Sequence, residues 1–166
     1  MEVGQVVQGH QGTAGGFQED AADGLGLVPE ALGKLASYDG VKECIIVSTC
    51  NRVELVSRVD RIDQGIDSLE HFFASNCDIP PERLKAHLYR HIGRQAVHHV
   101  FRVASSLDSM VLGEAQILGQ VKNFYGIAAD AATVGYYLNN LMQAAFHTAK
   151  RVRSETSIGE FSVSVS

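Results

Sequence analysis

Short apolar runs separated by turn residues occupy the first half of the chain. Residues 3–7 (VGQVV) and 44–47 (CIIV) are rich in β-branched side chains, which predicts two strands. The segment VELVSRV alternates well enough to predict a third strand, in which Val53, Leu55 and Val59 share one face. Because STCN lies between the second and third strands, we expect it to connect them.

Helical spacing is found between and after these strands. VPEALGKLASYDG predicts a helix between the first two strands, with Pro29 near its first turn and Gly40 past its end. Apolar residues recur at spacings of three and four in a second predicted helix, at Ile66, Leu69, Phe72 and Phe73. The order strand–helix–strand–strand–helix predicts an α+β fold in which helices back a small antiparallel sheet.

Three apolar stripes with helical spacing fill the second half of the chain. They comprise Val97, Val100, Phe101 and Ala104; then Ile117, Val121, Phe124 and Ala128; then Leu138, Leu141, Met142, Ala145, Ala149 and Val152. We therefore predict an α+β subdomain over residues 1–92 and a helical part over residues 93–166. Between the first two stripes, SSLDSMVLGEAQILGQ carries more hydrogen-bonding side chains than packing needs, which favours a binding role.

The composition is typical of a globular protein. Hydrophobic residues make up 45% of the 166 positions and charged residues 20%. No apolar run reaches the roughly 18 residues that a membrane span needs, and the first residues do not resemble a secretory signal. The three cysteines are an odd number at irregular spacings, which does not favour a disulfide framework. We therefore expect a cytoplasmic protein without a membrane partner.

The net charge of −5 argues against general nucleic-acid binding, which depends on local lysine and arginine. The stretch from Lys85 to Arg102 nevertheless holds four basic residues, four histidines and no acidic residue. Two interpretations of this stretch stay open, a local basic site and a solvated helix face.

Cys50 lies in the polar run STCNRVEL, between apolar segments. Zinc sites need pairs such as C-x2-C or H-x3-H, whereas five residues separate Cys44 from Cys50 and His98 is adjacent to His99. A metal site is therefore disfavoured. Cys44, inside an apolar run, is expected to be an inert core residue, and Cys77, beside an aspartate, a surface residue.

A nucleophilic role for Cys50 is the remaining chemical interpretation. A free thiol with a pKa of about 8.5 is only slightly ionised at neutral pH, and a nearby cation such as Arg52 would increase the thiolate fraction. Arg52 is also the residue type that holds a carboxylate through two hydrogen bonds. From spacing alone, a nucleophile and a small buried cysteine stay open as alternatives. His99 is a candidate base, although a histidine on a helix is more often structural.

Three motifs are similar to those of a known family. STCNRVEL, HHVFRVASSLDSMVLGEAQILGQVK and AKRVRSETSIG, the last followed by SVSV, closely resemble glutamyl-tRNA reductase, in order from about residue 41 to the end. The resemblance implies a ferredoxin-like antiparallel sheet with helices, joined to a helical subdomain. It also implies glutamyl-tRNA as substrate and NADPH as cofactor.

The resemblance assigns site residues position by position. Cys50 falls on the catalytic nucleophile, which takes the glutamyl group as a thioester, and His99 on a histidine important for activity. The positions that fall in substrate-binding segments are Thr49, Asn51, Arg52, Ser109, Glu114, Ala115, Gln116 and Gln120. We expect Cys50 to be at least partly accessible, in a pocket with Arg52, His99, Ser109 and Gln116.

Some positions differ from the family pattern. The amino-terminal run GHQGTAGGFQED lacks the usual lysine, proline and arginine, Ser106 replaces a glycine, and Ala115 replaces a proline. No G-x-G-x-x-G follows a strand, so no dinucleotide fingerprint is present. The family's NADPH-binding and dimerisation domains would follow Ser166, where the alternating FSVSVS looks like a cut. Neither domain is in this chain.

We therefore predict the catalytic amino-terminal domain of an NADPH-dependent reductase of tetrapyrrole biosynthesis. In the full-length enzyme, the thioester on Cys50 would be reduced to glutamate-1-semialdehyde; this fragment is expected to lack reductase activity. The resemblance further implies a homodimer for the full-length family and the downstream aminomutase as a partner. Two alternatives stay open: a non-catalytic tRNA-binding or partner-docking module, and a cysteine acyl hydrolase.

Overall fold

The fold is built on one four-stranded antiparallel sheet. The computed structural model describes residues 2–9, 24–49, 52–77, 88–108 and 113–159. Its strands are β1 (Glu2–Gly9), β2 (Val41–Ser48), β3 (Arg52–Val59) and β4 (Leu88–Ile92), in the spatial order β2-β3-β1-β4. Helix α1 (Gly24–Ala36) precedes β2, and helix α2 (Ile62–Cys77) precedes β4. This β-α-β-β-α-β order is ferredoxin-like, so the predicted fold class is confirmed.

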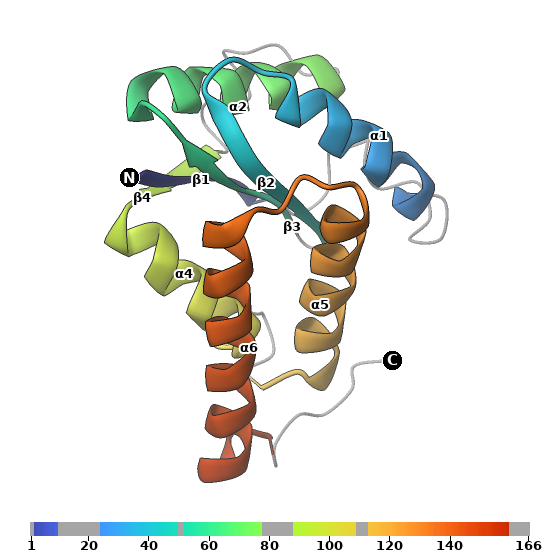
Figure 1. Cartoon of the computed structure of the whole chain (residues 1–166). Helices are drawn as coiled ribbons and strands as arrows, with labels where there is room; N and C mark the ends of the chain where they lie inside the picture. Colours follow the sequence, from blue (N-terminus) through green and yellow to red (C-terminus); the bar gives the residue numbers. More distant parts are fainter. Residues whose placement is uncertain (1, 10–23, 50–51, 78–87, 109–112, 160–166) are drawn as a thin grey trace.

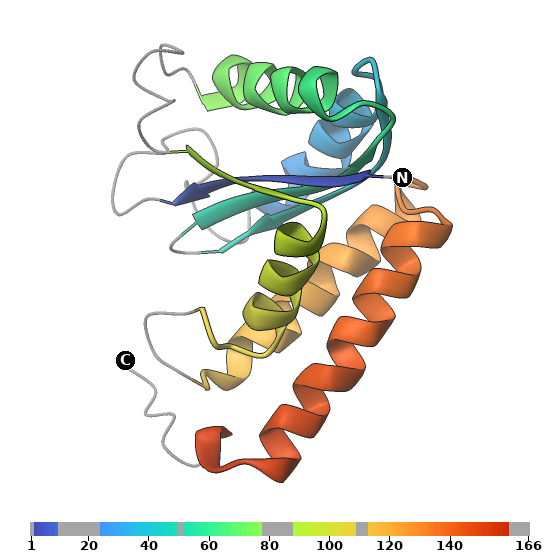
Figure 2. The same ribbon diagram turned by 90° about the vertical axis from the view of Figure 1, so that its left-hand side faces the viewer.

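Helices cover both faces of the sheet. Figures 1 and 2 show α1 and α2 on one face, and α4 (Arg94–Ala104), α5 (Ala115–Asp130) and α6 (Tyr136–Glu155) on the other. A 3-10 turn, η1 (Ser157–Gly159), follows α6. Because neither face of β2 or β3 meets solvent, both strands are buried almost without interruption instead of at alternate positions.

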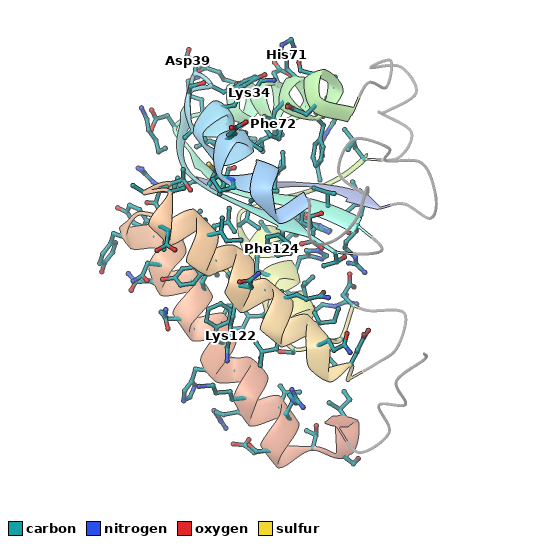
Figure 3. All side chains as sticks on the ribbon, turned by 90° about the vertical axis from the view of Figure 1, so that its right-hand side faces the viewer. Lys34, Asp39, His71, Phe72, Lys122 and Phe124 are labelled. Carbon is teal, nitrogen blue, oxygen red and sulfur yellow. The ribbon has the colours of Figure 1, made fainter. Side chains whose placement is uncertain are left out.

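The period of two along β3 decides which layer each side chain meets. Val59 lies against Gly65 of α2, whereas Glu54 contacts His99 of α4 and Arg58 lies over the ring of Tyr137 of α6. Odd-numbered residues of β3 therefore face α1 and α2, and even-numbered residues face the layer formed by α4, α5 and α6. In Figure 3, Phe72 lies in the layer of α1 and α2, and Phe124 lies in the layer on the other side of the sheet.

Two features of the amino-terminal half differ from the prediction. Strand β4 was not predicted, because LYRHI is a five-residue edge strand with no buried position and no regular apolar alternation. Helix α1 begins at Gly24, five residues before Pro29, so the predicted start near Pro29 is wrong. Proline in the second turn forfeits one backbone hydrogen bond, which the burial of Val28, Leu32 and Leu35 offsets.

The buried face of α4 is also rotated relative to the predicted stripe. Val100 and Ala104 are buried as expected, but Val97 and Phe101 are only half-buried. The buried positions of the helix are Ala96, His99, Val100, Val103 and Ala104. The core-facing side of α4 thus includes His99, whose ring contacts Glu54 of β3.

The helical layer is fastened to the edge strand β2. The buried carboxylate of Glu43 accepts hydrogen bonds from the backbone N–H groups of Gly135, Tyr137 and Leu138 at the start of α6. The N–H of Cys44 donates to the carbonyl of Thr133, and the Thr133 hydroxyl donates to the carbonyl of Cys44, at 2.9 Å each. One core contains residues from both predicted subdomains, and the division at residues 92 and 93 stays a prediction.

Candidate active site

The connection between β2 and β3 is closed by Thr49 and Arg52. The backbone N–H of Thr49 donates to the carbonyl of Arg52 at 2.9 Å, and the N–H of Arg52 donates to Thr49 Oγ1 at 3.3 Å. Strand β2 ends at Ser48 and β3 begins at Arg52, so the predicted strand-to-strand connection is confirmed. Positions 50 and 51 themselves lie outside the described residues.

Arg52 connects β3 to the segment that follows α4. Its Nη1 donates to Asp108 Oδ2 at 2.6 Å, and its Nη2 donates to the backbone carbonyl of Asp108. The same Nη1 lies 3.4 Å from Glu54 Oε1. Asp108 also pairs through Oδ1 with Arg102 Nη2, at 2.9 Å. The guanidinium is therefore held in a fixed orientation between two carboxylates.

His99 meets this cluster from the buried face of α4. Its Nε2 lies 3.2 Å from Glu54 Oε1, and its Nδ1 lies 4.0 Å from Asp108 Oδ2. The His91 ring stacks on the His99 ring with their centroids 4.7 Å apart, and Tyr89 meets the His99 ring edge-on at 5.8 Å. Strand β4, which was not predicted, thus supplies two rings that fix the plane of the imidazole.

Opposite charges in this cluster shift one another's pKa values, so that each group favours the ionised form of its partner. Burial raises the pKa of Asp108, but the hydrogen bond from Arg52 and the positive charges of Arg52 and Arg102 outweigh it, so the pKa is lowered. Burial lowers the pKa of Arg52, but the hydrogen bond to Asp108 and the nearby negative charges reverse this and raise it. Partial burial and the neighbouring His99 lower the pKa of His91. Arg52 and Asp108 are therefore ionised at neutral pH.

A small cavity adjoins the cluster. Its volume is about 20 Å³, which is room for one water molecule, and its lining comprises Val47, Thr49, Arg52, Glu54, Val103, Asp108 and Ile117. Ile117 brings α5 to the cavity. One turn further along α5, the buried Oε1 of Gln120 has no hydrogen-bond partner within the described part of the chain. A buried amide oxygen in that state is a candidate acceptor for a ligand donor.

The predicted site residues divide into those that the structure brings together and those that it does not. Thr49, Arg52 and His99 converge, and Gln120 lies on the helix that reaches the cavity. Glu114 precedes α5 and uses its backbone carbonyl to accept from Ser106 Oγ at 2.8 Å, while the side chain of Gln116 is exposed. Cys50, Asn51 and Ser109 lie outside the described residues, as does the side chain of Ala115.

Sequence reasoning missed Glu54 and did not single out Asp108. Glu54 is 2% exposed in a strand whose neighbours are apolar, and a carboxylate at such a position needs a partner. That signal could have identified it. Asp108 belongs to the polar segment predicted to bind, but only the fold shows that it faces Arg52.

Cys44 behaves as predicted. Its side chain is fully buried, and burial raises the pKa of the thiol to about 12. Among the described residues, no group of three or more His, Cys, Asp or Glu side chains could hold a metal ion. In the same part of the chain, no helix has both the length and the apolar character needed to cross a bilayer.

The sequence matches the family described as "Glutamyl-tRNAGlu reductase, N-terminal domain" over residues 17–156. This chain belongs to that family. Glutamyl-tRNA reductase from Geobacter metallireducens is 45% identical over 166 residues, which is 100% of this chain and 38% of the relative. That of Desulfatibacillum aliphaticivorans is 49% identical over 135 residues, 81% of this chain and 31% of the relative.

A solved structure agrees with this assignment to the glutamyl-tRNA reductase N-terminal domain family. Glutamyl-tRNA reductase from Methanopyrus kandleri superposes with a TM-score of 0.71 at 29% identity, covering 98% of this chain and 37% of that one. The chain thus spans less than two-fifths of the length of these relatives. The resemblance seen in the sequence motifs is confirmed.

Proposed function

We propose that this chain performs the acyl-transfer half of a glutamyl-tRNA reductase reaction, with Cys50 as nucleophile. The thiolate sulfur would attack the carbonyl carbon of the glutamyl ester. A carbon–sulfur bond forms, the bond from that carbon to the ribose oxygen breaks, and the oxygen leaves with a proton. The observation that supports this most is the convergence of Arg52 and His99 beside Thr49, one residue before Cys50.

The cluster has the groups that a glutamyl substrate requires. Arg52 is a fixed, ionised cation that could bind a substrate carboxylate, although Asp108 now occupies both of its terminal nitrogens. A substrate carboxylate would therefore compete with Asp108. The unpartnered Oε1 of Gln120 could accept from the substrate ammonium. His99, beside the nucleophile loop, would accept or return the proton. Asn51, Ser109, Glu114 and Gln116 stay proposed contacts.

NADPH would supply hydride to the thioester in the complete enzyme, but the residues present do not form its site. No G-x-G-x-x-G follows a strand in the sequence. We therefore assign no hydride step to this chain. Glutamyl-tRNA is the proposed partner, with a homodimer, the downstream aminomutase and a cytoplasmic location as further proposals from the family resemblance.

Release of labelled glutamate from glutamyl-tRNA tests this function. In a protein prepared from residues 1–166 alone, a thioester on Cys50 would be open to water, so this protein is expected to deacylate glutamyl-tRNA slowly and to form no aldehyde, with or without NADPH. Cys50→Ser should nearly abolish release, because an unactivated hydroxyl is a much poorer nucleophile. A thiol-specific label and a glutamyl-tRNA analogue should compete at Cys50.

Other results would contradict the proposal. Equal release by wild type and Cys50→Ser would mean that Cys50 is not the acyl acceptor. Binding of glutamyl-tRNA without any release would favour the non-catalytic binding module. Comparable cleavage of unrelated acyl esters would favour a general cysteine acyl hydrolase.

A further inference from the structure

One carboxylate oxygen joins the two site residues that lie on different elements. Glu54 Oε1 is 3.2 Å from His99 Nε2 and 3.4 Å from Arg52 Nη1. Glu54 is 2% exposed and His99 5%, so water does not screen their interaction. A charged side chain at so buried a position is costly unless it is paired. The pairing therefore ties strand β3 to helix α4 at this point.

The chemistry of the contact decides which nitrogen of His99 carries a proton. An ionised carboxylate only accepts hydrogen bonds, so Nε2 must be the donor toward Glu54. In the neutral imidazole, Nδ1 is then the nitrogen that can accept a proton. Because Arg52 donates toward the same oxygen, Glu54 also fixes the distance between the guanidinium and the imidazole.

We propose that Glu54 is a positioning residue of the thiol site. It holds His99 with the proton on Nε2, so that Nδ1, which lies 4.0 Å from Asp108 Oδ2, is the nitrogen that can take a proton, and it holds Arg52 beside the imidazole. Glu54 acts through these two residues and does not touch the substrate. This role rests on the proposed function, since its chemical consequence is a site ready for proton transfer at the thiol.

The first experiment observes directly which ring nitrogen of His99 is protonated, and it does not depend on enzymatic activity. The ring nitrogens of the whole chain, labelled with nitrogen-15, are observed by NMR at neutral pH, with His99→Asn to assign the His99 signals. The wild type should show His99 protonated on Nε2. Glu54→Gln can donate as well as accept, so a mixture of the two neutral tautomers is expected. An unchanged His99 spectrum in Glu54→Gln would overturn the proposal.

The second experiment separates positioning from simple loss of stability. Glu43→Gln is the matched control, because Glu43 is also a buried glutamate facing the helical layer, but it binds backbone N–H groups of α6. Alkylation of Cys50 by iodoacetamide, followed peptide by peptide from pH 6 to 10, should show a shifted pH profile in Glu54→Gln alone. Glutamate release should fall by about 10–100-fold, by analogy with the loss seen when a carboxylate that orients a metal-ligating histidine is removed.

The outcomes distinguish this role from the function on which it rests. Equal losses of release and alkylation in Glu54→Gln and Glu43→Gln, in proportion to their unfolding, would show a purely structural role and overturn the proposal. Full release by Cys50→Ser would contradict the acyl-transfer function, whereas the tautomer of His99 would still report on Glu54.

Discussion

At the residue scale, Arg52 matters for the planar shape of its guanidinium as well as for its positive charge. It donates from two nitrogens to Asp108 and contacts Glu54, an arrangement that one ammonium cannot reproduce. We expect Arg52→Lys to weaken glutamyl recognition by about 1.5–3 kcal/mol, the worth of a charge-assisted hydrogen bond, and to affect folding much less. The measurement is kcat/KM for glutamate release, beside an unfolding curve.

Lys34→Ala is the control for this substitution, because Lys34 lies on α1, in the layer on the other side of the sheet (Figure 3). It should leave release unchanged. Full release by Arg52→Lys together with a loss in Lys34→Ala would mean that the role of Arg52 is misassigned.

Asp108 makes the free energy of unfolding depend on pH. Its pKa is lowered in the folded protein, chiefly by the hydrogen bond from Arg52 once the opposing effect of burial is overcome. A lowered pKa contributes stability above the unfolded value of about 3.9, and that contribution disappears as the pH falls through the folded value. Wild type should therefore exceed Asp108→Asn in unfolding free energy at pH 7, and the difference should shrink below about pH 4.

Urea unfolding of both proteins between pH 7 and 3 measures this difference. A gap that stays constant down to the lowest pH at which both remain folded would show that the charge of Asp108 is not responsible.

The thiols offer a simple contrast at the same scale. Burial raises the pKa of Cys44 to about 12, so its thiolate fraction at neutral pH is negligible. Iodoacetamide at pH 7.5 should leave the Cys44 peptide unmodified in the folded protein and label it only in denaturant. Labelling of Cys44 at the rate of a free thiol would contradict the buried position.

The residues of the site could be predicted only where they belong to a local motif. Arg52 is close to Cys50 in sequence, and His99 lies in a distinctive run, so both were identified. Glu54 was not, because its role depends on a contact with a residue 45 positions away. The only local sign of this role was the position of a charged side chain between apolar residues of the strand. Long-range contacts of this kind require the fold.

At the element scale, the approach of α2 to the sheet depends on one glycine. A Cβ at Gly65 would lie 2.6 Å from Val59 Cγ1, closer than packed atoms allow. Gly65→Ala should therefore destabilise the protein by about 1–3 kcal/mol, since overpacking outweighs the gain in helix propensity. Chemical denaturation measures the change.

Gly33 provides the matched control within α1. A Cβ there would meet nothing within 4 Å, so Gly33→Ala should stabilise the protein by up to about 1 kcal/mol. Stabilisation of similar size by both substitutions would show that α2 can move away from β3 at little cost.

Prediction from hydrophobic periodicity succeeded for the elements with strong apolar patterns and failed for the edge strand β4. The strands around Ile45 and Leu55 and the long helix α6 have continuous or repeating apolar positions, which the core then buries. Strand β4 is short and half-buried, and it carries the rings of Tyr89 and His91 beside the site instead of an apolar face. Its pairing with β1 is set by tertiary structure.

At the scale of the whole molecule, charge is distributed unevenly between the two parts. Residues 1–92 hold 14 acidic and eight basic residues, whereas residues 93–166 hold five acidic and six basic. The net charge of −5 therefore conceals a helical part that is slightly positive. Helix α4 has no acidic residue, and its exposed Arg94, His98 and Arg102 follow one another at intervals of one turn.

This distribution predicts where a polyanion would approach. The arginines of α4 lie on the outer side of the helix whose inner side carries His99, so phosphates bound there would be close to the proposed acyl-transfer site. Arg94→Ala should weaken the binding of glutamyl-tRNA and reduce the slope of log affinity against log salt by about 0.7–0.9 for each phosphate that Arg94 neutralises. Lys34→Ala removes the same charge from α1, on the opposite layer, and should change neither quantity. The test is the affinity of both variants for glutamyl-tRNA, measured between 50 and 200 mM salt. Equal weakening of binding by Arg94→Ala and Lys34→Ala would mean that only total charge matters and that tRNA does not approach along α4.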